Sequence, residues 1–265
     1  MRILYIGDVM GEVGIETIEK VLPKLKTERG IDLVLAQSEN VSHGKGITPI
    51  DFERLQNFGV DFFTGGNHSF GKDKIFPLLN DPSQPIIRPA NYPVGTPGLG
   101  WKYIDMPTGK VLVISLLGQT VGKNTDLVLD NPLEVIDDIL DSQKSVDKVA
   151  TIVNFHGDFS SEKVIIGNYL DGRVTAVIGD HWHIPTADSR VLQGGTAHIT
   201  DVGMCGALNS SLGVTFGSVI PRWRYGIQNI NILETNGPRQ FNAVLIDSDT
   251  NGLAKSIEQI RIIIE

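Results

Sequence analysis

Polar side chains of the kinds that bind metals and carry protons follow five separate apolar runs of this sequence. The most compact example is Gly65-Gly66-Asn67-His68, which closes the apolar run 60–64 and places a carboxamide beside an imidazole. A single histidine after a strand is commonly a hydrogen-bonded structural residue, so this pair alone does not define a site. The other four runs end in the same way, in Asp8, in Glu39 and Asn40, in His156, and in His181 and His183.

Together these residues form a donor set of oxygen and nitrogen atoms. It contains two carboxylates, two carboxamides and four of the 6 histidines in the chain, and such ligands suit Mn²⁺, iron or Zn²⁺. Cys205 is the single cysteine, which excludes a cysteine-based zinc finger and an intrachain disulfide framework. The spacing of His181 and His183 lets both rings face one cavity, although the same spacing also arises by chance. With five chain segments carrying such residues, a metal site is the favoured interpretation.

The elements that must position these residues follow a β-α alternation, which predicts an α/β fold with a largely parallel sheet. The expected strands are 3–6, 33–36, 60–64, 111–117, 149–155 and 174–178, and the expected helices are 14–29, 48–58, 72–79, 132–141 and 161–170. In an open parallel sheet, ligands bind at the carboxyl ends of the strands. Because the polar residues follow the strands, we expect them to meet along one edge.

The last fifty residues are expected to be β-rich. The runs 226–233, 241–247 and 256–264 have strand character, and Asn251-Gly252 predicts a hairpin turn. No long Pro/Gly/Ser linker sets this part off, so we expect residues 1–265 to form a single domain closed by an antiparallel piece.

Composition limits the classes of partner. The chain has 265 residues, 41% of them hydrophobic and 20% charged, with a formal net charge of -8. Its surface therefore has no general attraction for duplex nucleic acid or anionic lipid. No apolar stretch approaches the length of a membrane span, and the N-terminal run meets Asp8 too soon to be a signal peptide. We expect a folded cytoplasmic protein that binds neither membrane nor duplex nucleic acid.

Several ordered motifs resemble those of known enzymes. "GDV" (7–9), "GNH" (66–68), His156 and "GDHWH" (179–183) are similar to the motifs of calcineurin-like metallophosphoesterases. Longer segments resemble the bacterial YmdB family of that superfamily, namely "SENVSHGKGIT" (38–48), "RPANYPVGTPGLG" (88–100), "SEK" (161–163), "YLDGRV" (169–174), "TAD" (186–188) and "GGTAHITDVGM" (194–204). The resemblance implies a calcineurin-like metallophosphoesterase fold: a mostly parallel central sheet or a two-sheet sandwich flanked by helices, with a β-rich C-terminal part.

The resemblance also implies a dinuclear site. One metal would be held by Asp8, Glu39 and His183, with Asn40 as an additional ligand, and Glu39 would bridge to a second metal held by Asn67, His156 and His181. Iron or manganese is the expected metal and zinc the alternative. The superfamily usually has a histidine where this chain has Met10, and an aspartate where it has Glu39. Both departures are also typical of the YmdB family.

The implied reaction is hydrolysis of a small phosphodiester, with a 2′,3′-cyclic nucleotide as the expected substrate. A metal-bridging hydroxide would attack the phosphorus, and His68 would protonate the leaving oxygen as general acid. Two alternatives stay open: a phosphomonoesterase or protein phosphatase using the same metals, and a regulatory metal-binding protein with vestigial activity. The intact His68 argues against the second. The sequence also leaves homo-oligomerisation open.

Four further residues are candidates for substrate contact. Trp182 lies between two proposed ligands and could stack on a nucleobase, or pack on the outside of its loop. His43 could reach a phosphate or face water. Arg88 and Asn91 lie in a turn-rich segment, where they could contact phosphate or sugar, or hydrogen-bond the loop backbone instead.

Overall fold

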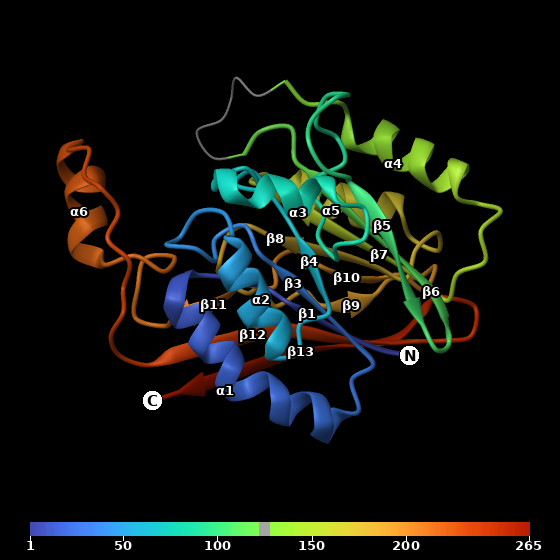
Figure 1. The fold of residues 1–265 in the computed structure, drawn as a ribbon, viewed down its shortest axis with the longest axis horizontal. Helices are drawn as coiled ribbons and strands as arrows, with labels where there is room; N and C mark the ends of the chain where they lie inside the picture. The colour runs from blue at the N-terminus through green and yellow to red at the C-terminus, as the bar shows by residue number, and fades with distance from the viewer. Residues whose placement is uncertain (122–127) are drawn as a thin grey trace.

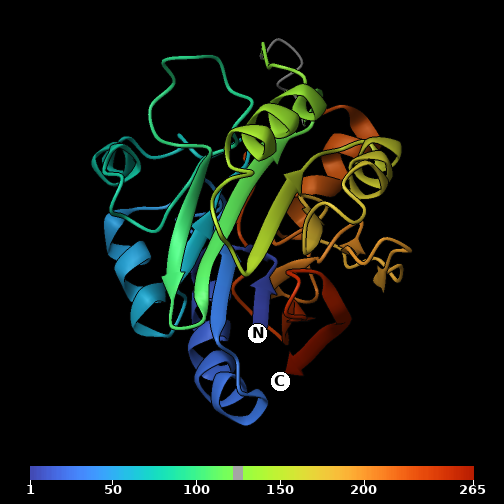
Figure 2. The same cartoon turned by 90° about the vertical axis from the view of Figure 1, so that its right-hand side faces the viewer.

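Two β-sheets pack face to face, and helices cover the outer face of each (Figure 1, Figure 2). This computed structural model describes residues 1–121 and 128–265. The layer between the sheets is filled by apolar residues from both, such as Ile3 and Leu35 from one sheet and Val113 and Ile178 from the other. Of the two architectures expected from the resemblance, the chain therefore adopts the two-sheet sandwich.

The first sheet is built around three parallel strands, β1 (Arg2–Ile6), β3 (Leu33–Gln37) and β4 (Phe62–Thr64). The other strands are β2 (Asp8–Val9), β11 (Met204–Ala207), β12 (Arg239–Ser248) and β13 (Ala254–Ile264). The order is β2-β11-β12-β1-β3-β4, with β13 paired to β12. Helices α1 (Gly11–Arg29) and α2 (Pro49–Asn57) pack on the outer face of this sheet.

The second sheet has the order β5-β6-β7-β8-β10-β9. Its parallel centre consists of β6 (Gly109–Leu117), β7 (Ala150–His156), β8 (Ala176–Asp180) and β10 (Ala197–Ile199), with β5 (Trp101–Met106) and β9 (Arg190–Val191) antiparallel at the edges. Helices α4 (Pro132–Ser142) and α5 (Ser160–Tyr169) cover its outer face. The buried residues of β6 and β7 are mostly apolar, because both faces of these strands are covered.

Local sequence signals account for the helix ends. The Thr48 side chain accepts a hydrogen bond from Asp51 N, and Pro49 occupies the first turn of α2. Helix α1 continues past Pro23 and ends at Gly30, which adopts the left-handed conformation. The helical stretch expected at 72–79 is a 3₁₀ turn (Asp73–Ile75) followed by the short helix α3 (Phe76–Asn80).

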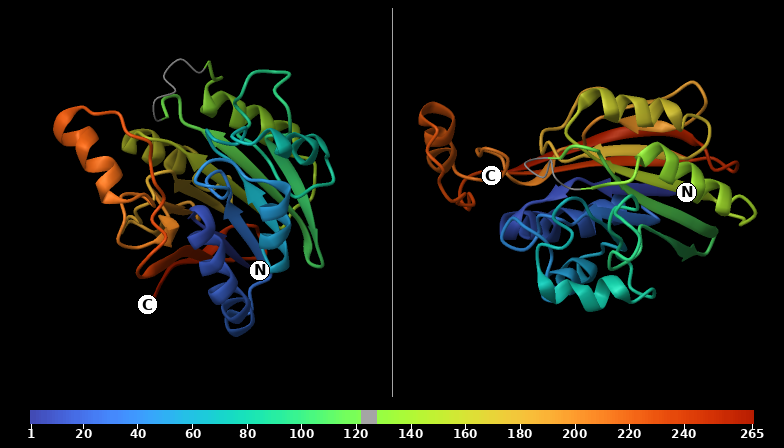
Figure 3. Two further views of the ribbon diagram at one scale, coloured as in Figure 1. Left: turned by 60° about the vertical axis from the view of Figure 1, so that its left-hand side comes forward. Right: turned by 90° about the horizontal axis from the view of Figure 1, so that it is seen from above.

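The C-terminal part confirms one expectation and corrects another. β12 and β13 form the expected antiparallel hairpin around Asn251-Gly252. The prediction of a strand at 226–233 was wrong. This segment follows helix α6 (Phe216–Tyr225), and within it only Leu233 makes a bridge, to Val214. Residues 226–233 lie away from both sheets and find no partner strand in the described part of the chain (Figure 3). The side chains of Ile227, Ile230 and Ile232 are exposed, so strand propensity alone led to the wrong prediction.

Within the described part of the chain, none of the helices combines the length and the apolar character that crossing a membrane requires.

Candidate metal centre

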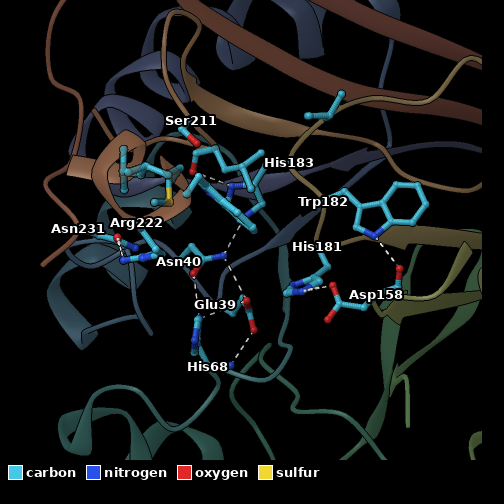
Figure 4. Close-up of a pocket in the computed structure, with 17 residues that line it drawn as sticks. Glu39, Asn40, His68, Asp158, His181, Trp182, His183, Ser211, Arg222 and Asn231 are labelled. Carbon is cyan, nitrogen blue, oxygen red and sulfur yellow. Dashed lines mark hydrogen bonds and ion pairs between the residues drawn. The ribbon is translucent and has the colours of Figure 1, made fainter. Parts of the chain in front are cut away.

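The expected ligands converge where parallel strands of the two sheets end. Asp8 lies within β2, Glu39 and Asn40 follow β3, and Asn67 and His68 follow β4, all in the first sheet. His156 ends β7, and His181 and His183 follow β8, in the second sheet. The expected single edge is thus formed jointly by two sheets, and Figure 4 shows Glu39, Asn40, His68, His181 and His183 around one cavity.

Glu39 is the centre of the cluster. Its Oε1 lies 3.2 Å from His156 Nε2 and 3.5 Å from His68 Nδ1, while Oε2 accepts a hydrogen bond of 2.7 Å from His68 N. Burial by itself raises the pKa of this carboxyl, but the charge and hydrogen bonds of His156 and His68 outweigh burial and hold the pKa well below its usual range. Glu39 is therefore an ionised carboxylate that contacts both His156 and His68.

Asp180 orients the imidazole of His156 by contacting Nδ1, the ring nitrogen that faces away from Glu39. His156 Nδ1 lies 2.6 Å from Asp180 Oδ1, and His156 Nε2 lies 3.0 Å from Asn67 Oδ1. Asp180 Oδ2 is in turn fixed by hydrogen bonds from Tyr5 OH and Asn154 Nδ2. Burial lowers the pKa of His156, but Glu39 and Asp180 raise it well above its usual value. A carboxylate behind a histidine fixes the ring and its tautomer, an arrangement that is common behind metal-binding histidines.

A second group of donors surrounds Asp8. Asn40 Nδ2 lies 3.4 Å from Asp8 Oδ1 and 3.2 Å from His183 Nε2. His183 Nδ1 donates to Leu212 O at 3.1 Å, so Nε2 is the unprotonated nitrogen that faces Asp8 Oδ1 at 3.7 Å. Burial, followed by repulsion from Asp180, raises the pKa of Asp8 well above its usual range. A bound cation would offset the repulsion between these buried carboxylates.

His181 presents a lone pair that has no partner among the described residues. Its Nε2 lies 3.1 Å from Asp158 Oδ1, while its buried Nδ1 makes no hydrogen bond within that part of the chain. Ligand atoms of Glu39, His156 and His181 all lie within 4.8 Å of one another. Burial lowers the pKa of His181 to about 3 and that of His183 to about 4, so both imidazoles are neutral at pH 7, the form that binds metal. The residues present fit a metal centre.

The backbone at these positions is specialised for close approach. His181 and His183 have φ angles of 101° and 62°, conformations that non-glycine residues rarely adopt outside functional sites. At Gly66, an added Cβ would lie 2.3 Å from Glu39 Oε2 and 2.6 Å from the His156 ring. Gly66 therefore leaves room for the carboxylate and the imidazole to meet, which gives this glycine of GGNH a steric reason.

A fully buried ion pair supports the loop that carries His181 and His183. Lys163 Nζ donates to Asp201 Oδ2 at 2.7 Å and to Asp180 O at 2.6 Å, and it lies 4.2 Å from the centroid of the Trp182 ring. Asp201 Oδ2 also accepts a hydrogen bond of 2.9 Å from Trp182 N. The ion pair thus contacts both the backbone and the ring of Trp182, the residue between His181 and His183.

His68 lies at the cavity wall beside the cluster. Its Nδ1 is 3.1 Å from Asn40 Oδ1, and its side chain is 32% exposed. The cavity has a volume of about 490 Å³. It is also lined by Met10 and Asp158, and by seven residues of the C-terminal part: Ser211, Leu212, Val214, Val219, Arg222, Trp223 and Asn231. His68 is therefore a histidine of the cluster that keeps access to the cavity.

The four residues considered for substrate contact have different surroundings. Trp182 lines the cavity and donates from Nε1 to Asp158 O at 3.0 Å, whereas His43 is exposed and lies outside the cavity lining. Arg88 donates to the backbone carbonyls of Pro89, Ala90 and Thr96. The side chain of Asn91 bonds the backbone of residues 117 and 130. Arg88 and Asn91 thus hydrogen-bond the protein backbone, which was the alternative to substrate contact.

No role was predicted from the sequence for Asp158, Asp180, Lys163 or Asp201. Signals were present: Asp180 belongs to the "GDHWH" motif, and Lys163 and Asp201 belong to the "SEK" and "GGTAHITDVGM" segments. Their contacts connect residues far apart in the chain, so no local pattern could pair them.

Similarity to known proteins extends over nearly the whole chain. A family model described as YmdB-like protein matches residues 4–260. A Bacillus subtilis (strain 168) protein named 2′,3′-cyclic-nucleotide 2′-phosphodiesterase is 37% identical over 263 residues, covering 99% of this chain and 97% of that protein. The solved structure of a Mycoplasma pneumoniae phosphatase has a TM-score of 0.92 at 31% identity, covering 99% of this chain and 93% of that one.

A solved structure from Thermus thermophilus is similar over its whole length. It has a TM-score of 0.90 at 32% identity and covers 99% of both chains. Relatives of this similarity share the fold from end to end. Since the family model spans nearly the whole chain, the protein belongs to the YmdB-like family.

Proposed function

We propose that the protein is a dinuclear metal-dependent phosphodiesterase that hydrolyses small phosphodiesters, 2′,3′-cyclic nucleotides first among them. The observation that carries the proposal is the buried cluster of Glu39, His156 and His181, whose ligand atoms lie within 4.8 Å of one another, with His68 next to it on the cavity wall. The printed name of the Bacillus subtilis relative supports the choice of substrate.

The residues that would hold the two ions form two overlapping groups. The first consists of Asp8, Glu39 and His183 with Asn40, and the second consists of Glu39, Asn67, His156 and His181. Their oxygen and nitrogen atoms suit iron or manganese, with zinc as the alternative. When bound, two such ions polarise the phosphate and make water a strong nucleophile at neutral pH.

The protein itself would supply the proton for the leaving oxygen. His68 Nδ1 is engaged by Asn40 Oδ1, so the proton would leave from Nε2 on the other side of the ring. The hydrogen bond from His68 N to Glu39 Oε2 fixes the position of this histidine relative to the ligands. General acids placed in this way contribute roughly 10²- to 10⁴-fold to a rate.

A phosphomonoesterase is the second candidate, because the similar Mycoplasma pneumoniae structure is that of a phosphatase. The two reactions need the same metals, and they differ in what else is attached to the phosphorus. A direct comparison of substrates separates them.

The test is hydrolysis of a 2′,3′-cyclic nucleotide and of a nucleoside monophosphate, together with metal analysis, for the wild type, Asn67→Ala and His68→Ala. We expect the cyclic diester to be the better substrate, Asn67→Ala to lose metal and activity, and His68→Ala to keep metal while losing activity. His43→Ala is the matched control, since His43 is exposed and lies outside the cavity lining. Absence of phosphoester cleavage with added Mn²⁺ or Fe²⁺ would refute the proposal.

A further inference from the structure

Residues 214–233, here named the arm, project from the two-sheet body (Figure 1, Figure 3). The arm consists of helix α6 and the extended return 226–233, and its base is closed by Thr215 N, which donates to Ile232 O at 2.8 Å. Part of its sequence was expected to form a strand, and the proposed chemistry uses none of its residues. Nevertheless one side of the arm forms a wall of the cavity that contains Glu39 and His68.

Helix α6 turns one face toward this cavity. Val219, Arg222 and Trp223 all line it, and their spacing of three and four residues places them on one side of the helix. Asn231 joins them from the return of the arm. In Figure 4, Arg222 and Asn231 lie across the cavity from His181. The arm is therefore placed to contact the part of a substrate that extends away from the metal ligands.

Arg222 is a cation held in position at this wall. Its Nη2 donates to Asn231 Oδ1 at 2.8 Å and to Asn229 O at 3.1 Å. Its Nε is buried and has no hydrogen-bond partner among the described residues. A guanidinium that is already ordered loses little entropy when it binds the acceptor atoms of a ligand.

Trp223 supplies a flat apolar surface next to this cation. Its side chain is 83% exposed, an unusual state for the largest aromatic residue, and it still lines the cavity. Aromatic side chains in such places stack on nucleobases whatever the base sequence. The cavity volume of about 490 Å³ lies in the range of small-molecule sites.

We infer that the arm is the nucleobase subsite: the base stacks on Trp223, and Arg222 binds acceptor atoms of the base or ribose while the phosphate lies at the metal ligands. This inference rests on the proposed phosphodiesterase function and adds the residues that determine substrate preference. A bare phosphodiester would be a poorer substrate because it leaves the arm without a contact.

The experiment compares a 2′,3′-cyclic nucleotide with ribose 2′,3′-cyclic phosphate, which has the same reacting ring but no base. Wild-type protein should show a lower KM for the nucleotide. Trp223→Ala should raise that KM by about 5- to 150-fold, the range expected for loss of one stacked base, and leave the KM for the ribose compound and both kcat values within about twofold. Arg222→Ala should act in the same direction, and Arg222→Lys should restore part of the preference.

Arg224→Ala is the matched control, because Arg224 is on the same helix, lies over Tyr225 and does not line the cavity. It should behave as the wild type. We expect Trp223→Ala to stay folded, because its side chain is exposed and takes no part in the backbone pairing at the base of the arm. Equal losses on both substrates, or no loss on either, would overturn the inference while the phosphodiesterase function stands. If the wild type cleaves neither compound, the proposed function fails and the inference falls with it.

Discussion

Replacing Lys163 by Met tests whether the buried ion pair holds the loop that carries His181 and His183. The substitution keeps most of the volume of the side chain but leaves Asp201 buried without its cation. Breaking a buried pair by removing one partner costs about 3–5 kcal/mol of the free energy of unfolding. The variant also loses the donor to Asp180 O and the cation over Trp182, so the loop that carries His181 and His183 becomes less ordered.

The destabilisation should depend on pH in a defined direction. Burial raises the pKa of Asp201, and Lys163 opposes that rise, so the pKa must rise further in Lys163→Met. A carboxyl with a raised pKa in the folded state favours folding when protonated, and this contribution is lost as pH rises through the folded-state pKa. The deficit relative to the wild type should therefore grow with pH, by at most about 1.4 kcal/mol per pH unit.

Urea unfolding at pH 5 and pH 8, in excess chelator, measures this deficit without the contribution of metal. The control is Lys24→Met, which removes an exposed partner of Glu28 and should change the free energy of unfolding by only about 0.5 kcal/mol. Metal titration of the folded variant should show affinity about 10- to 100-fold weaker than in the wild type. A deficit below about 1 kcal/mol, or one that is equal at both pH values, would show that the Lys163–Asp201 pair does not stabilise the fold in this way.

Three further perturbations address the proposed metal centre directly. Gly66→Ala should leave the chain folded but with less than one metal per chain by elemental analysis, because the new Cβ would lie 2.3 Å from Glu39 Oε2. The control is Gly217→Ala, whose new Cβ would have nothing within 4 Å and which should retain the metal content of the wild type. Asp158→Ala removes the partner of His181 Nε2 and should weaken metal affinity about 10- to 100-fold in a competition assay. An unchanged affinity would show that Asp158 does not support metal binding. Chelator treatment should abolish phosphodiester turnover, and added Mn²⁺ or Fe²⁺ should restore it; full activity after complete metal removal would contradict the assignment.

The strands that carry the candidate ligands could be predicted from the sequence because they are short, largely apolar runs. The sequence also predicted the convergence of residues from Asp8 to His183, since polar residues after parallel strands share an edge. The partition of these strands between two sheets was left open, because the order in which strands pair is decided by contacts between distant segments. Asp8 illustrates the point, since it lies in β2 and pairs with Met204 of β11.

The arm and the supporting network were beyond local patterns for different reasons. Apolar residues such as Ile230 gave 226–233 the appearance of a strand, but a strand also needs a neighbour, and this segment is exposed. The roles of Asp180 and Lys163 depend on contacts with His156 and Asp201, which only the packed structure brings together. The left-handed backbone at His181 is likewise imposed by the loop and not by its own residue type.

The proposed function requires that the cluster around Glu39 hold two metal ions when the protein hydrolyses a phosphodiester. The most direct measurement is the rate of hydrolysis of a 2′,3′-cyclic nucleotide by metal-free protein as Mn²⁺ is added in known ratios to the chain. We expect activity to rise until two ions are bound per chain and then to stay constant. Full activity with one ion per chain, or no activity at any ratio, would contradict this expectation.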